Sequence, residues 1–408
     1  MRWLGWEHVT ALAPQMSAEQ RRAAWIAGTA HALNDGYTDL TYIMLPLWQA
    51  EFGLSYAALG ALRGVFVGAM AVLQIPAGLL SERFGAAAIL AGGTALAGLG
   101  YCLAGASVGF AMLLGALLIG GIGASAQHPI ASALVARAFA GPRSLKALGT
   151  YNFSGDIGKM TVPAVLALML LAMPWRPALA LLGSVGVAMA VVIFLLTPRF
   201  EGGAAERRAI PQAGRERKRQ PHALYLLLTI GIIDSATRMG FLLFLPFVLR
   251  NKGASEQTIG LALTLIFAGG AAGKLACTFI GARIGTIVTV WLTEGLTAAG
   301  IVTLLSLPLD GALALLPAIG IALNGTSSVL YGSVPDLVAP QWRTRALSIF
   351  YTGTIGSGAV APLLFGRLGD ALGVGAALAL VAGFVLTTLP LAALLRSAFA
   401  PDYGSTTA

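Results

Sequence analysis

Apolar and polar positions alternate along the chain in long blocks. Stretches of about 20 mostly apolar residues, the length that crosses a bilayer as a helix, recur with short polar connectors between them. This pattern predicts an all-α membrane protein with twelve transmembrane helices, at residues 24–48, 56–80, 86–105, 108–134, 147–173, 177–197, 222–248, 257–280, 285–306, 311–333, 347–366 and 374–396. Gly and Ala recur inside these spans, as is typical of helices that pack closely in lipid.

The longest polar interruption separates two sets of six spans. It contains the charged runs Glu206–Arg208 and Arg215–Arg219, which are too polar for a bilayer. The first 22 residues are mixed and polar and do not resemble a cleavable signal peptide. We therefore predict an N-terminal segment, a six-helix bundle, a linker, a second six-helix bundle and a tail, at 1–23, 24–197, 198–221, 222–396 and 397–408.

Basic residues are distributed unevenly between the connectors, which predicts the orientation. The connectors on the side of the linker carry Arg83, Arg137, Arg143, Lys146, Arg283, Arg343 and Arg345, whereas the opposite ones carry Arg176, Arg250, Lys252 and Arg367. Cytoplasmic loops are enriched in Lys and Arg. We expect a multi-pass protein of the cell inner membrane with segment, linker and tail in the cytoplasm.

Composition excludes several function classes. Hydrophobic residues make up 57% of the chain and charged residues 11%, against about a quarter charged in soluble domains. The net charge of +9 lies in the loops, so no nucleic-acid partner is expected. Cys102 and Cys277 lie in apolar segments and predict no disulfide framework. Because no phosphate-binding Gly-Lys-Ser/Thr loop is present in the sequence, we do not expect ATP as the driving force. We also expect neither a cofactor nor enzymatic activity.

The chain repeats itself at an offset of 200 residues. Several positions match between the halves: Pro46 with Pro246, Gly53 with Gly253, Ser55 with Ser255, Gly60 with Gly260, and Arg83-Phe84-Gly85 with Arg283-Ile284-Gly285. Parallel repeats with a binding site between them are typical of rocking secondary transporters. The repeat therefore favours transport over catalysis or a structural role.

A short polar turn between the second and third spans resembles a family motif. It reads Gly78-Leu79-Leu80-Ser81-Glu82-Arg83-Phe84-Gly85, and it is similar to the loop motif of the major facilitator superfamily. Ala86 to Ala88 stand where the family usually adds basic residues. The resemblance implies a twelve-helix transporter in which Gly78, Glu82, Arg83 and Gly85 control the exchange between conformations.

Two narrower resemblances point to export. The runs His31 to Asp35 and His128-Pro129, with Ser132 and Val135 after the second, resemble the fosmidomycin-resistance efflux branch of that superfamily, although Asp156 and Lys159 depart from it. The spacing of Gly149, Gly158 and Pro163, with Val162 in place of a glycine, resembles the antiporter motif of drug:proton exporters. A closely packed, kinked helix is the alternative interpretation of these three residues.

Ionisable residues inside spans are costly and usually functional. His31, Asp35 and Asp39 are spaced by four residues, with Asn34 and Thr38 beside them. Steps of about 40° put the three on one helix face, which we expect to face a central cavity. His128 in the fourth span is a further candidate. Structural hydrogen bonds are the alternative role for all of them.

The other candidates are basic or paired. Asp156 and Lys159 are three residues apart and are expected to pair on one helix face. Asp234 and Arg238 occupy the repeat positions of Asn34 and Thr38, across the cavity. Arg63 is expected to snorkel to the outer end of its span, and Lys274 to approach the inner end of its own.

These residues predict a proton-coupled secondary transporter. Arg238 and Lys159 would hold a small organic anion, zwitterion or drug, while the acids and histidines, above all Asp35, would carry protons. Export of a divalent metal or metal chelate by His31, Asp35, Asp39 and His128 is one alternative. A membrane sensor without transport activity is another. We expect a monomer whose other partners are protons and the bilayer, with no resident metal.

Overall fold

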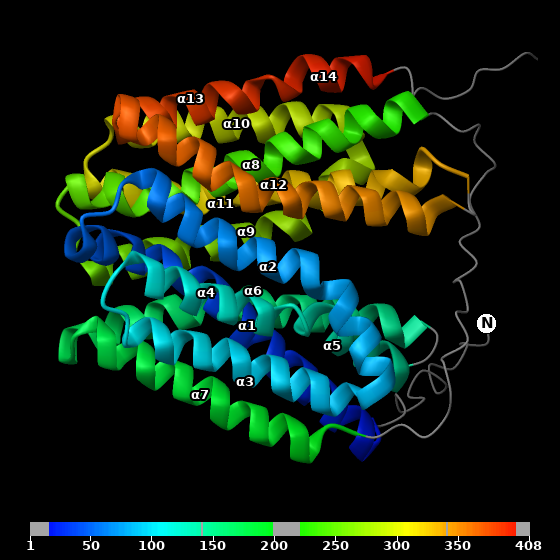
Figure 1. The fold of residues 1–408 in the computed structure, drawn as a ribbon. Helices are drawn as coiled ribbons and strands as arrows, with labels where there is room; N and C mark the ends of the chain where they lie inside the picture. The colour runs from blue at the N-terminus through cyan, green and yellow to red at the C-terminus, as the bar shows by residue number, and fades with distance from the viewer. Residues whose placement is uncertain (1–15, 140–141, 199–220, 340–341, 397–408) are drawn as a thin grey trace, which may run out of the picture.

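The computed structural model describes residues 16–139, 142–198, 221–339 and 342–396. Most of the predicted N-terminal segment, the linker and the tail lie outside these residues. The described elements are helices, arranged as two bundles side by side (Figure 1). The first bundle contains α1 Ala18–Phe52, α2 Tyr56–Phe84, α3 Ala86–Gly105, α4 Phe110–Ala124, α5 Gln127–Ala138, α6 Pro142–Ala172 and α7 Trp175–Leu196. The second contains α8 Pro221–Asn251, α9 Glu256–Ile284, α10 Thr286–Ser306, α11 Leu309–Ser333, a 3₁₀ turn Val334–Asp336, α12 Arg343–Leu372, α13 Val374–Leu386 and α14 Thr388–Leu394.

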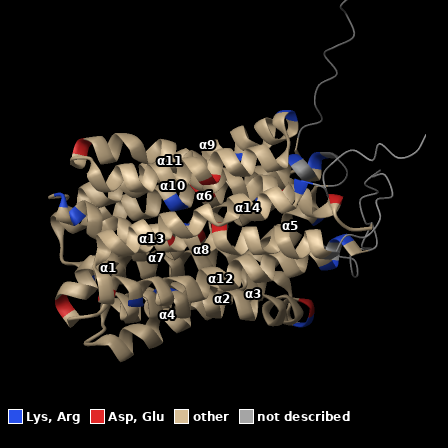
Figure 2. Ribbon diagram, turned by 90° about the horizontal axis from the view of Figure 1, so that it is seen from above, with Lys and Arg blue, Asp and Glu red and all other residues tan. Residues whose placement is uncertain are grey.

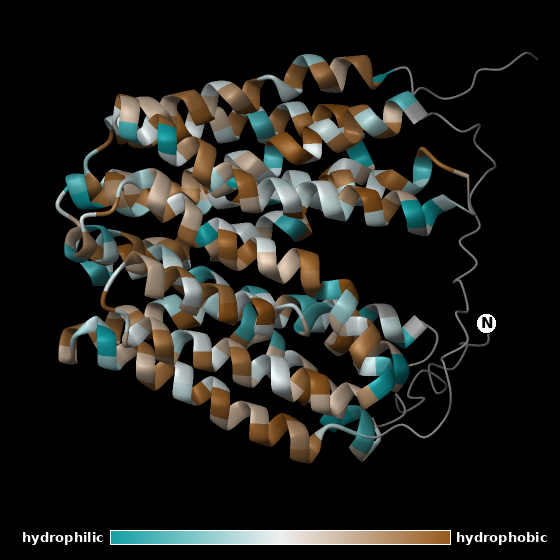
Figure 3. Cartoon of the chain, viewed as in Figure 1, coloured by the Kyte–Doolittle hydropathy of each residue, from teal (hydrophilic) through white to brown (hydrophobic). Residues whose placement is uncertain are grey.

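The predicted all-helical membrane fold is confirmed. Within the described residues, 11 helical stretches are long and apolar enough to cross a membrane. The polar stripe on α1 lowers its hydropathy, so α1 is not among them, but its 35 residues are ample for a span. Apolar residues dominate the helices along their length (Figure 3).

Two predicted spans are each divided into two helices. The span 108–134 consists of α4 and α5, and the span 374–396 consists of α13 and α14. At the first break the Ser125 hydroxyl donates to Ile122 O at 2.7 Å, and at the second the Thr387 hydroxyl donates to Phe384 O at 2.6 Å. Such local side-chain hydrogen bonds compete with the helical pattern.

The internal repeat recurs in the local geometry. α2 and α9 begin after Ser55 and Ser255, whose hydroxyls accept from the amide three residues later. Both helices end at a glycine with positive φ, 89° at Gly85 and 84° at Gly285. This backbone conformation favours glycine, which explains why the repeat keeps it at both positions.

The two bundles meet through α2 against α12 and α6 against α9. We call the side where α7 ends and α8 begins the connector side, on the right in Figure 1, and the opposite side, where α1 ends, the far side. On the far side the Asp370 carboxylate of α12 accepts from the amides of Tyr56 and Ala57, at 2.6 and 3.0 Å. Thr264 of α9 donates to Met160 O of α6 at 3.0 Å. The far side is therefore closed by direct hydrogen bonds between the halves.

Buried apolar clusters show the same asymmetry. The largest cluster joins both halves and includes Trp48, Phe66 and Phe244. Two smaller clusters lie toward the connector side, one within each half, around Ile26 and Leu227. Most charged residues lie at the two ends of the bundle, and a few lie midway along it (Figure 2). The halves thus share a core on the far side and separate toward the connector side.

Candidate functional site

A cavity of about 900 Å³ lies between the two halves. Helices α1, α2, α5 and α6 line it from one half, and α8, α9, α11 and α12 from the other. All the charged or imidazole side chains that line it were noted in the sequence, namely His31, Asp35, Asp39, Arg63, His128, Asp156, Lys159, Asp234, Arg238 and Lys274. Asn34 is buried beside them without lining the cavity.

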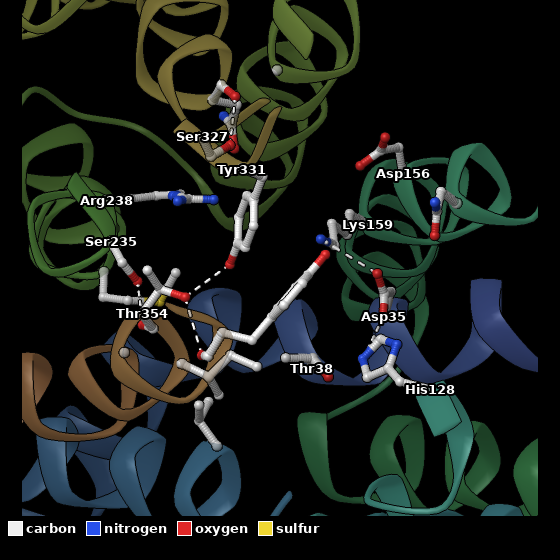
Figure 4. Close-up of a pocket in the computed structure, with 18 of the residues that line it drawn as sticks. Asp35, Thr38, His128, Asp156, Lys159, Ser235, Arg238, Ser327, Tyr331 and Thr354 are labelled. Atoms are coloured by element: carbon white, nitrogen blue, oxygen red, sulfur yellow. Dashed lines mark hydrogen bonds and ion pairs between the residues drawn. The ribbon is translucent and has the colours of Figure 1, made fainter. Parts of the chain in front are cut away.

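Asp35 is the centre of the polar cluster on the N-terminal half (Figure 4). Its carboxylate oxygens lie 3.3 Å from Lys159 Nζ, 3.4 Å from His31 Nε2 and 3.9 Å from His128 Nε2. The amide of Asn34 approaches the same carboxylate at 3.4 Å. Asp35 therefore connects one ammonium group and two imidazoles in a largely buried position.

His31 is fixed by its second ring nitrogen. Nδ1 lies 2.9 Å from the carbonyl oxygen of Tyr151, which makes Nδ1 the donor. The ring stacks on Tyr151 with centroids 4.2 Å apart. With Nδ1 protonated, Nε2 of the neutral imidazole is an acceptor, so it can receive a proton near Asp35.

Small residues bring α6 close enough for Lys159 to reach α1. A Cβ placed on Gly158 would lie 1.8 Å from Ala32 O, and one on Gly36 would lie 2.3 Å from Val162. Only glycine fits such an approach. A Cβ on Gly149 would meet no atom within 4 Å, while Pro163 lies inside α6. Of the two glycines of the motif, Gly158 therefore packs against α1 and Gly149 does not.

Arg63 corrects a prediction. The expectation that it snorkels to the outer end of α2 is wrong, because Arg63 is 2% exposed. Its Nη2 lies 2.9 Å from Asp39 Oδ1, its Nη1 donates to Thr38 O, and its guanidinium lies 4.4 Å from the Tyr42 ring centroid. The acid one turn above Asp35 supplies the counter-ion that makes this burial tolerable.

Asp156 and Lys159 also differ from the expected arrangement. The structure pairs each with another helix: Lys159 with Asp35 on α1, and Asp156 with Lys274 on α9, where Nζ to Oδ1 is 2.5 Å. Lys274 thus faces the cavity. Residues three apart on a helix are neighbours, but an ion pair between them is weak. Each of the two residues therefore pairs with an oppositely charged side chain on a facing helix.

Arg238 and Asp234 line the opposite wall. Their side chains are 3.1 Å apart, and Arg238 extends toward the centre of the cavity (Figure 4). Tyr331 on α11 shares a 2.8 Å hydrogen bond with the Thr354 hydroxyl of α12 next to them. As expected from the repeat, Arg238 faces the Asp35 cluster across the cavity (Figure 4), and Asp234 lines the same cavity from α8.

The lining is balanced in charge. Among the described residues that line the cavity, four acids face four bases, and each acid contacts a base. With neutral imidazoles the sum is zero. A charged substrate must therefore compete for a paired group, or bind when a proton has released one.

Several polar residues of the region were not singled out in the sequence. Gln74, Tyr151, Asn324, Tyr331 and Thr354 line the cavity, but uncharged polar residues are common in helices and gave no signal. Glu294 on α10 is 1% exposed, and an acid inside an apolar span was a signal that could have identified it.

The turn motif lies away from the cavity. Gly78, Glu82 and Arg83 belong to the connector-side end of α2, and Gly85 ends that helix. Glu82 and Arg83 are exposed, and the Arg83 guanidinium lies 5.2 Å from the Phe84 ring centroid. Neither charged residue is placed to contact a molecule in the cavity.

Comparisons with known proteins agree with this architecture. The "Probable 4-methylmuconolactone transporter" of Cupriavidus pinatubonensis (strain JMP 134 / LMG 1197) is 24% identical over 361 residues, 84% of this chain and 83% of that protein. The "Fosmidomycin resistance protein" of Escherichia coli (strain K12) is 25% identical over 268 residues, 64% of this chain and 65% of that protein. This similarity is too low to establish the branch.

The fold is shared with a solved transporter structure. The crystal structure of a bacterial homolog to the human lysosomal transporter Spinster, in an inward-facing and unoccupied conformation, superposes with a TM-score of 0.79 at 15% identity, covering 96% of this chain and 100% of that one. Sequence profiles of the Major Facilitator Superfamily match residues 25–233 and 227–405. The chain therefore belongs to the Major Facilitator Superfamily, and it is a multi-pass membrane protein and secondary transporter rather than an enzyme.

Proposed function

We propose that the protein exports a small organic anion, zwitterion or drug in exchange for protons. One observation supports this most strongly: a buried carboxylate, Asp35, connects a lysine and two histidines on one wall, and Arg238 faces them from the other wall. Proton-accepting groups and an anion-binding group thus share one cavity.

Asp35 is the proposed coupling carboxylate. A proton that binds it removes the negative charge that holds Lys159 at 3.3 Å. His31 and His128 are close enough to pass the proton on, and imidazole changes its charge near physiological pH. Protonation of Asp35 would therefore change the balance of charge that a substrate meets in the cavity. This change would couple proton movement to substrate release.

Arg238 is the proposed anion-binding cation. A guanidinium keeps its charge at physiological pH and can bind a carboxylate or phosphonate through two parallel hydrogen bonds. Its present partner Asp234 occupies one face of it at 3.1 Å. Tyr331 and Thr354 lie beside it as further hydrogen-bonding groups. A substrate acid would replace or join Asp234 there.

Alternating access between the halves is the proposed transport cycle. The far side is closed by Asp370 and the α6–α9 contacts, so the present form is open toward the connector side. The loop charges support a cytoplasmic connector side in the inner membrane, and we propose that the monomer is the working unit. The names of the relatives support a small-molecule substrate without choosing one.

Reconstituted vesicles test the proposal directly. The purified protein, placed in proteoliposomes with an imposed pH gradient and a pH-sensitive dye inside, is presented with a panel of organic anions, zwitterions, drugs and divalent metals. Proton movement that depends on one organic substrate, and that is absent with Asp35→Asn, supports exchange. Substrate accumulation that is unaffected by the pH gradient contradicts proton coupling.

A divalent metal or metal chelate is the second candidate. Ligand atoms of His31, Asp35 and His128 lie within 4.8 Å of one another, and imidazole with carboxylate suits divalent ions. Lys159 opposes a cation there because its ammonium lies 3.3 Å from the same carboxylate. Metal-dependent quenching of tryptophan fluorescence that His128→Ala removes would favour this candidate over the organic substrate.

A further inference from the structure

A buried acid lies in the C-terminal half, outside the cavity. Glu294 on α10 is 1% exposed and does not line the cavity. Among the residues that the structure describes, its Oε1 has no hydrogen-bond partner, and neither has Oδ1 of Asp234 on the adjacent helix α8. An ionised carboxylate in such a position is costly unless a cation compensates it.

The charged groups around Glu294 do not provide that compensation. Helix α8, which packs against α10, carries the charged residues Asp234 and Arg238. Arg238 is already engaged, with Nη2 at 3.1 Å from Asp234 Oδ2. Lys274 of the packed helix α9 is held by Asp156 at 2.5 Å. From α11 the Thr326 hydroxyl contacts Thr293, the residue before Glu294, while the described helices α13 and α14 contain no ionisable side chain.

The remaining neighbours are hydroxyl groups. Thr326 donates to the Thr293 hydroxyl at 2.6 Å, and both side chains are buried. Thr297 follows Glu294 by one helical turn, is 0% exposed, and its hydroxyl has no partner among the described residues. Hydroxyls can solvate a neutral carboxyl group, but they bring no positive charge.

Charge balance decides the state of this group. With both acids ionised, Asp234, Glu294 and Arg238 would carry one net negative charge, and the Glu294 carboxylate is shielded from water. A single proton on an oxygen of Glu294 makes the group neutral and turns that oxygen into a donor. We propose that Glu294, together with Asp234, forms a second proton-binding site in the C-terminal half, and that Glu294 holds this proton in the present conformation.

The site differs from the one at Asp35 and is reached through a different residue. Asp234 lines the cavity with a side chain that is 3% exposed, whereas Glu294 on α10 does not line it. In the proposed site, Asp234 is the group through which a proton from the cavity reaches Glu294. The inference goes beyond the proposed function, which uses Asp35 alone as coupling carboxylate.

Infrared spectroscopy of the full-length protein in lipid tests this site without a substrate. A protonated carboxyl group has a C=O stretching band that shifts in deuterium oxide, and stepping the pH reveals where the band is lost. We expect such a band near neutral pH in the parent protein, its loss in Glu294→Gln, and its retention in Glu19→Gln, an exposed control on α1. Asp35→Asn should also retain the band, so this test and the test of Asp35 fail independently.

Further variants keep the test decisive. Asp234→Asn removes one negative charge near Glu294, which makes ionisation of Glu294 less costly. Glu294 should therefore lose its proton at a lower pH than in the parent protein, and the band should disappear at that lower pH. Glu294→Met offers a second neutral side chain should Glu294→Gln fail to fold. A band that persists in Glu294→Gln overturns the proposal, as does a parent protein without such a band. Failure of both neutral variants to fold also overturns it, because a neutral side chain is the proposed native form.

Discussion

Lys274 of α9 and Asp156 of α6 form an ion pair across the cavity, with Nζ and Oδ1 2.5 Å apart. The two residues belong to different halves, so this contact links the bundles midway between the closed far side and the open connector side. Removing one partner leaves the other charge inside the cavity without its counter-ion.

We predict a measurable coupling between these two residues. Asp156→Asn and Lys274→Gln should each lower the free energy of unfolding by about 1–3 kcal/mol, and the double variant should recover part of the loss. Thermal unfolding in detergent measures all three. The pair Glu51 and Arg176, whose side chains are 34% and 39% exposed, is the matched control and should show a coupling below about 1 kcal/mol. Additive losses at Asp156 and Lys274 would contradict the pairing.

Asp35→Asn should abolish proton-driven transport and leave substrate binding largely intact. The amide keeps the shape of the carboxylate but cannot take up a proton, and it leaves Lys159 without its partner at 3.3 Å. Accumulation in vesicles with and without a pH gradient measures the first effect, and equilibrium binding the second. If Asp35→Asn still concentrates substrate against its gradient, the proton assignment is wrong.

Arg238→Ala should weaken the binding of an anionic substrate by about 10- to 100-fold, the loss expected for a charge-assisted hydrogen bond. Arg238→Lys should restore part of it, because lysine keeps the charge without the paired geometry. Asp234→Asn should instead strengthen binding, since it frees the guanidinium from its partner at 3.1 Å. Unchanged affinity in Arg238→Ala would refute the assignment.

Glu82→Gln should slow transport with little change in substrate affinity. Glu82 lies at the exposed connector-side end of α2, away from the cavity. Transport rate and equilibrium binding, measured on the same preparation, separate the two effects. Glu19→Gln, at an exposed position on the same side, serves as control. Lost binding with a preserved conformational cycle would argue against a role in exchange.

Cysteine labelling should show the far side outside the cell. Ala50 and Asn251 are exposed near Gly53 and Gly253, whose positive φ angles of 62° and 90° make the glycines themselves poor positions for cysteine. In a background without Cys102 and Cys277, an impermeant reagent should label Ala50→Cys and Asn251→Cys in intact cells. Arg215 lies in the linker, outside the described residues. The reagent should label Arg215→Cys only after the cells have been lysed. External labelling at 215 would reverse the topology.

The sequence predicted the helical spans more completely than the contacts between side chains. Apolar runs and the 200-residue repeat indicated the spans, because lipid imposes the same requirement on each helix regardless of its neighbours. The spacing of His31, Asp35 and Asp39 likewise placed them on the cavity face. The ion-pair partner of a charged side chain depends on how the helices pack, which the sequence pattern does not reveal. Arg63 was therefore expected at the membrane surface, whereas the structure places it beside Asp39.

The breaks in the spans 108–134 and 374–396 were missed for a related reason. A single Ser or Thr, such as Ser125 or Thr387, is common inside membrane helices and carries no periodic signal. Whether its hydroxyl bonds to a carbonyl of the preceding turn, as both do here, depends on the local backbone. Glu294 was missed although an acid in an apolar span was visible in the sequence.

The hydrogen bonds of Asp370 make the two end states of the transporter unequal. Its carboxylate caps α2 of the opposite half on the far side, yet the position 200 residues earlier is Leu170, which has no group to cap α9 in the same way. The two halves therefore repeat the same backbone fold but differ in the hydrogen bonds that join them on the far side. Opening of the far side requires both hydrogen bonds of this carboxylate to break on the α2–α12 flank, whereas the α6–α9 flank is joined by single hydrogen bonds from Thr264 to Met160 O and from Gln257 to Ala167 O, at 3.0 and 3.2 Å. The two flanks are thus expected to contribute unequally to the free energy of opening, with the larger polar contribution on the α2–α12 flank.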